Sequence, residues 1–259
     1  MQEPLLLKEW IKMIQRQPQR EDLINQLLPN GSGIMLLAGR PGVGKTNLAL
    51  LLGLCLASGK PFLGFSCKRA SVTYLAFEMA DDKYLARFDK LLPQFPSSVV
   101  DNFRFARILP TKLKQVDSDF LSLLTGASIV IIDPLRYLVA GDFIKPQDAA
   151  TFISIINEIA RKYDISFILI HHVKKPQGFL RVEPDDLYQL KGATEYVDAA
   201  TTVLLLEKAK HGLGSKGFGP SKDRYILYFA KTRDALAEIE PVKLVFNRDK
   251  LLFEKEEMI

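Results

Sequence analysis

The chain is poor in the residues that mark disulfide-rich, metal-binding and membrane-spanning proteins. It has 2 cysteines, Cys55 and Cys67, among 259 residues, and no cysteine and histidine spacing typical of a metal site. This excludes a disulfide framework, and we expect both thiols to be reduced and structural. The longest apolar run, residues 48–58 (LALLLGLCLAS), is well short of the roughly 20 residues that cross a bilayer, so it predicts a buried helix.

The amino terminus also lacks the features of a secretion signal. MQEPLLLKEW has no basic start, no apolar middle and no small-residue cleavage site, so we expect a cytoplasmic protein with no membrane partner. Charge of one sign is only slightly in excess, with 35 Lys and Arg against 30 Asp and Glu and a net charge of +5. Such a balance permits a polyanionic partner such as nucleic acid but does not require one.

What the chain does contain is apolar sequence arranged in short runs. Its 259 residues and 47% apolar content suffice for the core of one α/β domain or of two small ones. Continuous apolar runs alternate with helical segments, which is typical of a mainly parallel sheet whose strands are joined by crossover helices. We expect strands at residues 33–39, 71–79, 127–134, 165–172 and 200–207, and helices at residues 45–58, 81–92 and 147–163.

The two ends of the chain have a different pattern. Helical periodicity over residues 1–28, interrupted at Pro18, predicts an N-terminal helical arm at residues 1–29 and a single domain at residues 30–259. Near the carboxyl end, the runs RYILYFAKTR, PVKLVFN and KLLFEKE predict antiparallel strands joined by turns. We find no internal repeat.

A phosphate-binding loop follows the first predicted strand. GRPGVGKT satisfies G-x-x-x-x-G-K-[ST] between a predicted strand and a predicted helix, as the mechanism requires. Glycines let backbone N–H groups wrap the phosphates, Lys45 can reach the terminal phosphates of ATP, and Thr46 can coordinate Mg²⁺. The predicted nucleotide-binding residues are Gly39, Arg40, Pro41, Gly42, Val43, Gly44, Lys45, Thr46 and Asn47. A chance match or a non-hydrolysing nucleotide site is the alternative.

Two carboxylates follow predicted strands. Asp133 ends an apolar strand, where the carboxyl edge of a sheet meets phosphates, so we predict that it is a Mg²⁺ ligand; the alternative is an aspartate that caps a turn. Many ATPases place their catalytic glutamate next, but Pro134 cannot accept a proton. We therefore predict that Glu78, at the end of the strand 71–77, orients and activates the attacking water. Its alternative is a carboxylate at a helix start.

A polar side chain follows a third strand. The run ILIHHVKK ends in His171 and His172, and a side chain at this edge can hydrogen-bond the γ-phosphate and change conformation on hydrolysis. We predict His172 as the phosphate sensor. A purely structural histidine is the alternative.

The chain resembles RecA-like hexameric helicases of the DnaB and plasmid RepA type over about residues 30–254. The resemblance is carried, in order, by GRPGVGKT, YLAFEMADDKYLARF, IVIIDPL, ILIHHVKK, LKGATEYVDAATTVLLL and YFAKTRD. It implies a RecA-like P-loop core, Glu78 as the catalytic glutamate and His172 as the phosphate sensor. It also implies that Lys231 and Arg233 reach the nucleotide of a neighbouring subunit. Asp234 and the residues after it depart from the small residue, glycine and proline that commonly follow K-x-R in this family.

The resemblance further implies an ATP- and Mg²⁺-dependent motor that forms a homo-oligomeric, hexameric ring and acts on single-stranded DNA, with a replication or recombination protein as a possible partner. In such rings the N-terminal arm packs on the adjacent protomer; folding back onto its own domain is the alternative. Loops after Asp133 and after His172 are expected to face the central channel. The predicted DNA contacts are Arg136, Lys174, Lys175, Arg181 and Lys191.

Two other functions fit the same motifs. A recombinase-mediator or KaiC-like regulatory ATPase would use hydrolysis to switch protein partners without moving DNA. A nucleotide-dependent assembly module would bind ATP and not hydrolyse it. The catalytic residues do not separate a motor from a regulator, because both need the same chemistry.

Overall fold

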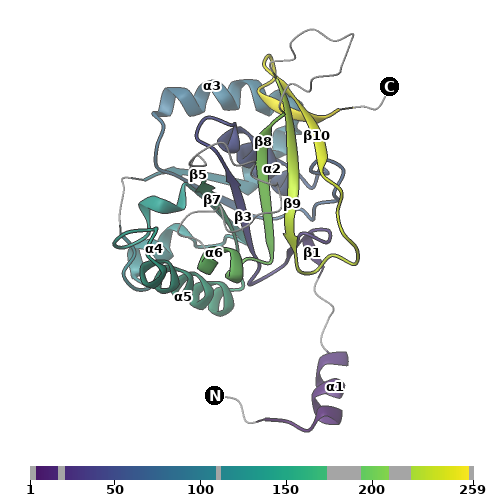
Figure 1. Cartoon of the computed structure of the whole chain (residues 1–259), viewed down its shortest axis with the longest axis vertical. Coiled ribbons are helices and arrows are strands. Elements are labelled where there is room, and N and C mark those ends of the chain that lie inside the picture. The colour runs from purple at the N-terminus through teal and green to yellow at the C-terminus, as the bar shows by residue number, and fades with distance from the viewer. Residues whose placement is uncertain (1–3, 17–20, 109–111, 174–193, 210–222, 257–259) are drawn as a thin grey trace, which may run out of the picture.

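The sheet at the centre of the protein is mainly parallel. The computed structural model describes residues 4–16, 21–108, 112–173, 194–209 and 223–256. Its nine-stranded sheet has the order β11-β10-β9-β8-β3-β7-β6-β4-β5 (Figure 1). The parallel strands are β3 (Ile34–Gly39), β4 (Val72–Ala76), β5 (Phe103–Arg107), β6 (Ile129–Asp133), β7 (Ser166–His172) and β8 (Thr202–Lys208). The antiparallel strands are β9 (Arg224–Thr232), β10 (Val242–Asn247) and β11 (Leu252–Lys255). The predicted fold class is therefore confirmed.

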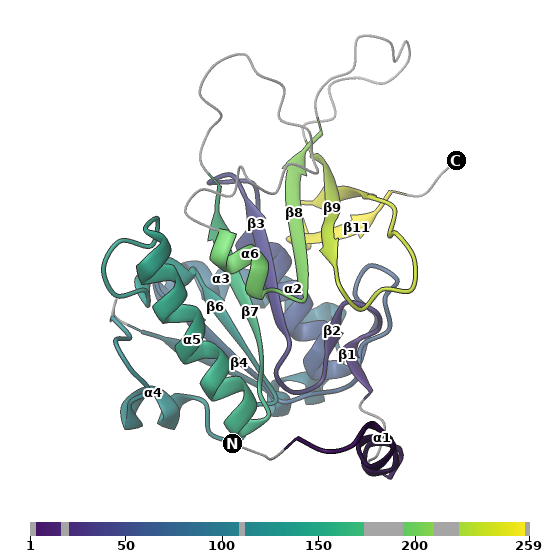
Figure 2. The ribbon, with the colours of Figure 1, turned by 60° about the horizontal axis from the view of Figure 1, so that its bottom comes forward.

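Helices cover both faces of the sheet (Figure 2). One face carries α2 (Lys45–Ser58) and α3 (Asp81–Leu91), and the other carries α4 (Ser118–Leu123), α5 (Pro146–Tyr163) and α6 (Thr194–Ala199). Short 3-10 helices are η1 (Leu92–Gln94), η2 (Ser97–Asn102) and η3 (Leu135–Tyr137). None of the helices in the described residues combines the length and the apolar character needed to span a membrane.

Alternation along each strand divides the core into two layers. In β3, Met35 and Leu37 pack into the layer under α2, whereas Ile34 and Leu36 pack into the layer under α5. Both sets are buried, which explains why the parallel strands are continuous apolar runs. The apolar run 48–58 is indeed a buried helix, the body of α2, and each fully buried leucine in it contributes about 1.5–3 kcal/mol of transfer free energy.

The helical prediction for the amino-terminal residues is wrong in its second half. Residues 7–15 form α1 (Leu7–Gln15), but β1 (Asp22–Ile24) and β2 (Leu28–Pro29) form an antiparallel hairpin. Gln26 adopts a positive φ of 63° in its turn, and its N–H donates to Asp22 Oδ2 at 2.8 Å. The spacing that suggested a helical face instead brings apolar side chains from both strands into the core beneath α2.

Candidate active site

The phosphate-binding loop connects β3 to α2 at the carboxyl edge of the parallel strands. Gly42 and Gly44 have φ values of 75° and 102°, a left-handed region that other residues rarely adopt. A Cβ on Gly44 would lie 2.8 Å from the Phe253 ring of β11, so the close approach of the last strand also requires glycine. The loop therefore has the backbone shape that cradles phosphates at a helix amino terminus.

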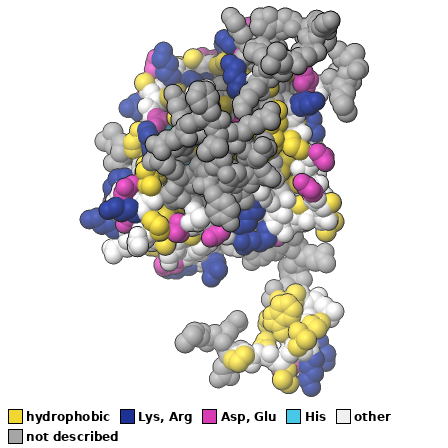
Figure 3. All heavy atoms as spheres, viewed as in Figure 1, with side chains coloured by type: hydrophobic (Ala, Val, Ile, Leu, Met, Phe, Trp, Pro, Cys, Tyr) yellow, Lys and Arg dark blue, Asp and Glu magenta, His cyan; other side chains and the backbone are white. Residues whose placement is uncertain are grey.

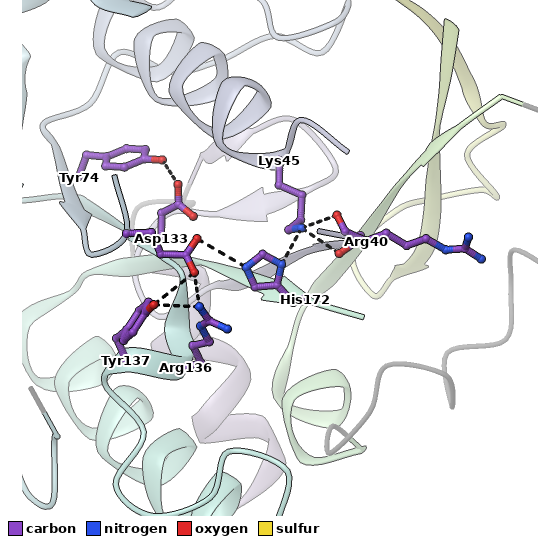
Figure 4. Close-up of polar contacts among 9 residues, drawn as sticks. Arg40, Lys45, Tyr74, Asp133, Arg136, Tyr137 and His172 are labelled. Carbon is purple, nitrogen blue, oxygen red and sulfur yellow. Dashed lines mark hydrogen bonds and ion pairs between the residues drawn. The ribbon is translucent and has the colours of Figure 1, made fainter. Parts of the chain in front are cut away.

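Lys45 is the buried cation of this loop. Its Nζ donates to the carbonyl oxygens of Gly39 at 2.8 Å and Arg40 at 2.9 Å, and to His172 Nδ1 at 3.1 Å (Figure 4). These contacts use every N–H donor of the ammonium. Burial lowers the pKa of Lys45 to about 8, although the charges of Asp133 and Glu78 oppose the shift. A phosphate oxygen entering the loop would have to replace some of these hydrogen bonds.

Asp133 lies at the end of β6 and is only 4% exposed. The Tyr74 hydroxyl donates to its Oδ2 at 2.6 Å. Burial raises the pKa of Asp133, while hydrogen bonds from Tyr74 and Thr46 lower it. The carboxylate of Asp133 and the hydroxyl of Thr46 are hard oxygen donors of the kind that Mg²⁺ prefers, so these two residues fit the ion. The described part of the chain has no group of three or more His, Cys, Asp or Glu side chains that could hold a metal ion.

Glu78 reaches the same edge from the neighbouring strand. Ala76 of β4 is level with Asp133 of β6, and the chain continues past it to Glu78. The Glu78 carboxylate forms an ion pair with Arg136 through Oε1, while its Oε2 lies 3.9 Å from His172 Nε2. Glu78 precedes α3, which begins at Asp81, so it does not belong to the first turn of that helix.

His172 is the last residue of β7, and its ring faces Lys45 (Figure 4). Its other ring nitrogen lies 3.9 Å from Glu78. Because an ammonium has no acceptor, the hydrogen bond from Lys45 requires a lone pair on His172 Nδ1. The proton of the neutral ring is then on Nε2, facing Glu78. Burial, followed by the charges of Lys45 and Arg136, lowers the pKa of His172 to about 4, so the imidazole is neutral near pH 7. A neutral ring thus lies between the phosphate-loop lysine and the carboxylate.

Arg136 and Tyr74 contribute contacts that the sequence alone did not predict. Arg136, which we expected to contact DNA, directs its guanidinium to Glu78 and lies 4.7 Å from the centre of the Tyr137 ring. Tyr137 in turn stacks on Phe77, with ring centres 6.0 Å apart. One sequence signal was available for Tyr74, because a tyrosine within a buried apolar strand needs a partner for its hydroxyl. No comparable signal points to the pair of Arg136 and Glu78.

Lys231 and Arg233 lie away from this site. The Arg233 N–H donates to Thr201 O and the Thr201 N–H donates to Ile34 O, so Arg233 is level with the first residue of β3, opposite the phosphate loop. Arg233 donates to Asp198 O at 2.9 Å, and Lys231 Nζ donates to Val197 O at 2.6 Å. Both cations therefore hydrogen-bond the last carbonyl groups of α6, where the helix dipole favours positive charge. Burial, followed by the charge of Arg233, lowers the pKa of Lys231.

The remaining predicted residues are only partly placed by the structure. The Asn47 side chain accepts a hydrogen bond from Arg87 Nε at 2.9 Å and so connects α2 to α3. The Arg40 side chain extends away from Lys45 and His172 (Figure 4). Four of the predicted DNA contacts, Lys174, Lys175, Arg181 and Lys191, are outside the described residues.

Comparisons with known proteins bear on the family and the fold of the chain. A sequence model of the AAA domain family matches residues 2–178. A solved structure described as an "ATPase Domain" is similar, with a TM-score of 0.67, 14% identity and 97% of each chain covered. So is "The Structure Of A DnaB-Like Replicative Helicase And Its Interactions With Primase", with a TM-score of 0.64 and 13% identity, covering 99% of this chain and 68% of that one. No curated protein sequence matches. The chain belongs to the AAA domain family and has the RecA-like fold of helicase-type P-loop ATPase domains.

Proposed function

We propose that this protein is a ring-forming ATPase that translocates on single-stranded DNA, as a helicase or a related motor. The observation that carries the proposal is that the predicted catalytic residues and the predicted arginine finger lie at opposite ends of the sheet. Lys45, Asp133, Glu78 and His172 gather at one edge of the sheet, whereas Arg233 lies level with the opposite end of β3. A site whose last cation comes from another subunit hydrolyses ATP only after assembly.

Hydrolysis would use the residues at the carboxyl edge in separate roles. Lys45 would exchange its bonds to Gly39 and Arg40 for phosphate oxygens, and Thr46 and Asp133 would hold Mg²⁺. The ion supplies charge neutralisation on the β- and γ-phosphates when bound. Glu78 would accept a hydrogen bond from water and polarise it for in-line attack on the γ-phosphate. One carboxylate oxygen, Oε1, is paired with Arg136 in this structure, so the water would have to bind at Oε2 or displace Arg136 from Oε1.

His172 would report on the γ-phosphate. Its Nδ1 accepts from Lys45, and its Nε2 faces Glu78 at 3.9 Å, which is too long for a hydrogen bond. When Lys45 turns to a phosphate, the imidazole loses its partner and is free to move. Because His172 ends β7, such a movement passes directly to the segment that follows it.

The amino-terminal helix supports assembly into a homo-oligomer. Apolar side chains of α1 and the residue before it are exposed and form a group apart from the rest of the molecule (Figure 3). They are Leu6, Leu7, Trp10, Ile11 and Ile14. An exposed apolar helix face is stabilised when a partner covers it. In a closed ring, we propose, each α1 packs on the adjacent protomer, and the expected ring is a hexamer.

The second candidate function is a regulatory ATPase of the recombinase-mediator or KaiC-like kind. It shares Lys45, Glu78, Lys231 and Arg233, and the modest net charge of +5 suits a protein partner as well as DNA. For the motor, one of the similar solved structures is of a DnaB-like replicative helicase and its interactions with primase, which supports a replication protein as a partner. A module that binds ATP without hydrolysis is less favoured, because Glu78 and Asp133 follow neighbouring strands to the same edge of the sheet.

Two measurements test the proposal. Turnover of ATP with and without single-stranded DNA should show acceleration by DNA that fades as salt rises, alongside a solution mass larger than a monomer. In the second, equal amounts of the Glu78→Gln and Arg233→Ala proteins are mixed. Each alone is expected to be inactive, but about a quarter of the interfaces in a mixed head-to-tail ring combine an intact Glu78 with an intact Arg233. A fully active monomer indifferent to DNA would overturn the proposal.

A further inference from the structure

Tyr74 is buried in the middle of β4 and its hydroxyl is directed at Asp133 (Figure 4). The two residues lie on neighbouring parallel strands, and the hydroxyl donates to Asp133 Oδ2 at 2.6 Å. Such a short O–H···O distance is typical of a hydrogen bond to a charged oxygen. The contact therefore joins the predicted metal-binding carboxylate to a side chain that is not part of the phosphate loop.

The aromatic ring of Tyr74 is held in place by its neighbours. It stacks on Phe103 and Phe105, with ring centres 6.2 and 5.8 Å apart, and meets Tyr84 edge-on at 6.4 Å. Tyr74 is fully buried. Because a tyrosine has few rotatable bonds, this packing leaves its hydroxyl with almost no freedom to leave Asp133.

Packing alone does not require the hydroxyl. A phenylalanine would fill the same aromatic cluster, and a buried hydroxyl has a desolvation cost that phenylalanine lacks. What the hydroxyl adds is a fixed donor to one oxygen of Asp133. With Oδ2 held, the carboxylate cannot rotate, and Oδ1 keeps one orientation. Hydrogen bonds of this kind to a ligating carboxylate orient the ligand and tune metal affinity.

We propose that Tyr74 is a positioning residue of the metal site, which holds the Asp133 carboxylate in the orientation that binds Mg²⁺ together with ATP. Tyr74 acts through Asp133 and touches neither the ion nor a phosphate. This inference rests on the proposed function only in requiring that the site takes up a metal–nucleotide complex.

The test compares Tyr74→Phe with Tyr84→Phe in the full chain. Tyr84 belongs to the same aromatic cluster, and both variants lose a phenolic oxygen. Of the two hydroxyl groups, the hydroxyl of Tyr74 is the one that donates to Asp133 Oδ2. Mn²⁺, a paramagnetic substitute for Mg²⁺, is titrated by electron paramagnetic resonance in the presence of a non-hydrolysable ATP analogue. Tyr74→Phe should weaken Mn²⁺ binding by about tenfold, whereas Tyr84→Phe should match the wild type.

Two further readouts separate positioning from packing. Affinity for a fluorescent ATP analogue in EDTA should be equal in wild type and Tyr74→Phe, and excess Mg²⁺ should restore the turnover of the variant. In an Asp133→Asn background, Tyr74→Phe should cause no additional loss of Mn²⁺ affinity, because the carboxylate through which Tyr74 acts has already been removed.

Several results would overturn the inference. Unchanged Mn²⁺ affinity in Tyr74→Phe would show that the hydrogen bond does not position the ligand, and equal losses in the two tyrosine variants would assign the effect to packing. A Tyr74→Phe protein that also binds the analogue poorly in EDTA would point to a damaged loop. A failure of the part of the proposed function that this inference needs gives a different result, because the wild-type protein would then bind no Mn²⁺ together with the ATP analogue.

Discussion

The ion pair between Arg136 and Glu78 predicts that Arg136 restrains hydrolysis in the absence of DNA. Glu78 polarises water through its carboxylate oxygens, and the guanidinium of Arg136 occupies Oε1 and offsets part of the negative charge that would orient the water. Replacing Arg136 with alanine removes this restraint and leaves Lys45 and Asp133 unchanged. We therefore expect Arg136→Ala to raise the basal rate of ATP hydrolysis.

The size of the increase follows from the exposure of the pair. The side chains of Arg136 and Glu78 are 40% and 33% exposed, so solvent screens their attraction and the ion pair contributes at most about 1 kcal/mol. If all of that restraint is relieved in the transition state, the rate rises about fivefold. The difference between variant and wild type should shrink as salt is added, because salt screens a partly exposed ion pair.

Steady-state phosphate release at saturating ATP, without DNA, measures the effect. Arg107→Ala is the matched control, because Arg107 pairs with Asp81 at 2.9 Å and is similarly exposed, but does not touch Glu78. Its basal rate should equal that of the wild type. A basal rate in Arg136→Ala that is unchanged or lower, with ATP binding intact, would refute the reasoning and assign Arg136 a supporting role in catalysis.

Three further predictions follow from the same structure. The pKa of His172 is about 4 in the fold, below its ordinary value of 6.5, so its contribution to stability is complete above pH 6.5 and is lost as the pH falls towards 4. In urea unfolding, the free energy of unfolding should therefore fall less between pH 7 and pH 5 in His172→Gln than in the wild type. Leu23→Ala should lower the free energy of unfolding by about 2–5 kcal/mol, because Leu23 is buried in the core. Leu7→Ala, on the exposed face of α1, should leave the free energy of unfolding unchanged but weaken assembly, which sedimentation would measure. Gly44→Ala should abolish binding of a fluorescent ATP analogue, because φ is 102° and the new Cβ would meet Phe253; wild-type affinity would contradict this.

Local sequence patterns predicted much of the site. The P-loop motif predicts a strand, a glycine-rich turn and a helix that begins near the lysine of the motif, and Lys45 is the first residue of α2. Apolar runs predicted the parallel strands, since strands buried on both faces require them. The carboxyl ends of β4 and β6 meet at one edge, which is why Glu78 and Asp133 could be expected near each other. The edge strand β5 was missed because its half-exposed residues form no apolar run.

Contacts between distant residues were decided only by the tertiary structure. Tyr74 and Asp133 are 59 positions apart, and Glu78 and Arg136 are 58 apart, so no local period encodes either pair. The apolar spacing that includes Leu23 fits a helix face and a hairpin equally well, and burial beneath α2 selected the hairpin. The sequence alone thus determined the kind of loop, the positions of the main parallel strands along the chain and the charges available at their ends, whereas the order of the strands in the sheet came from the structure. The packing of the strands and loops decided which side chain pairs with each charged group, because hydrogen bonds and ion pairs form between neighbours in space.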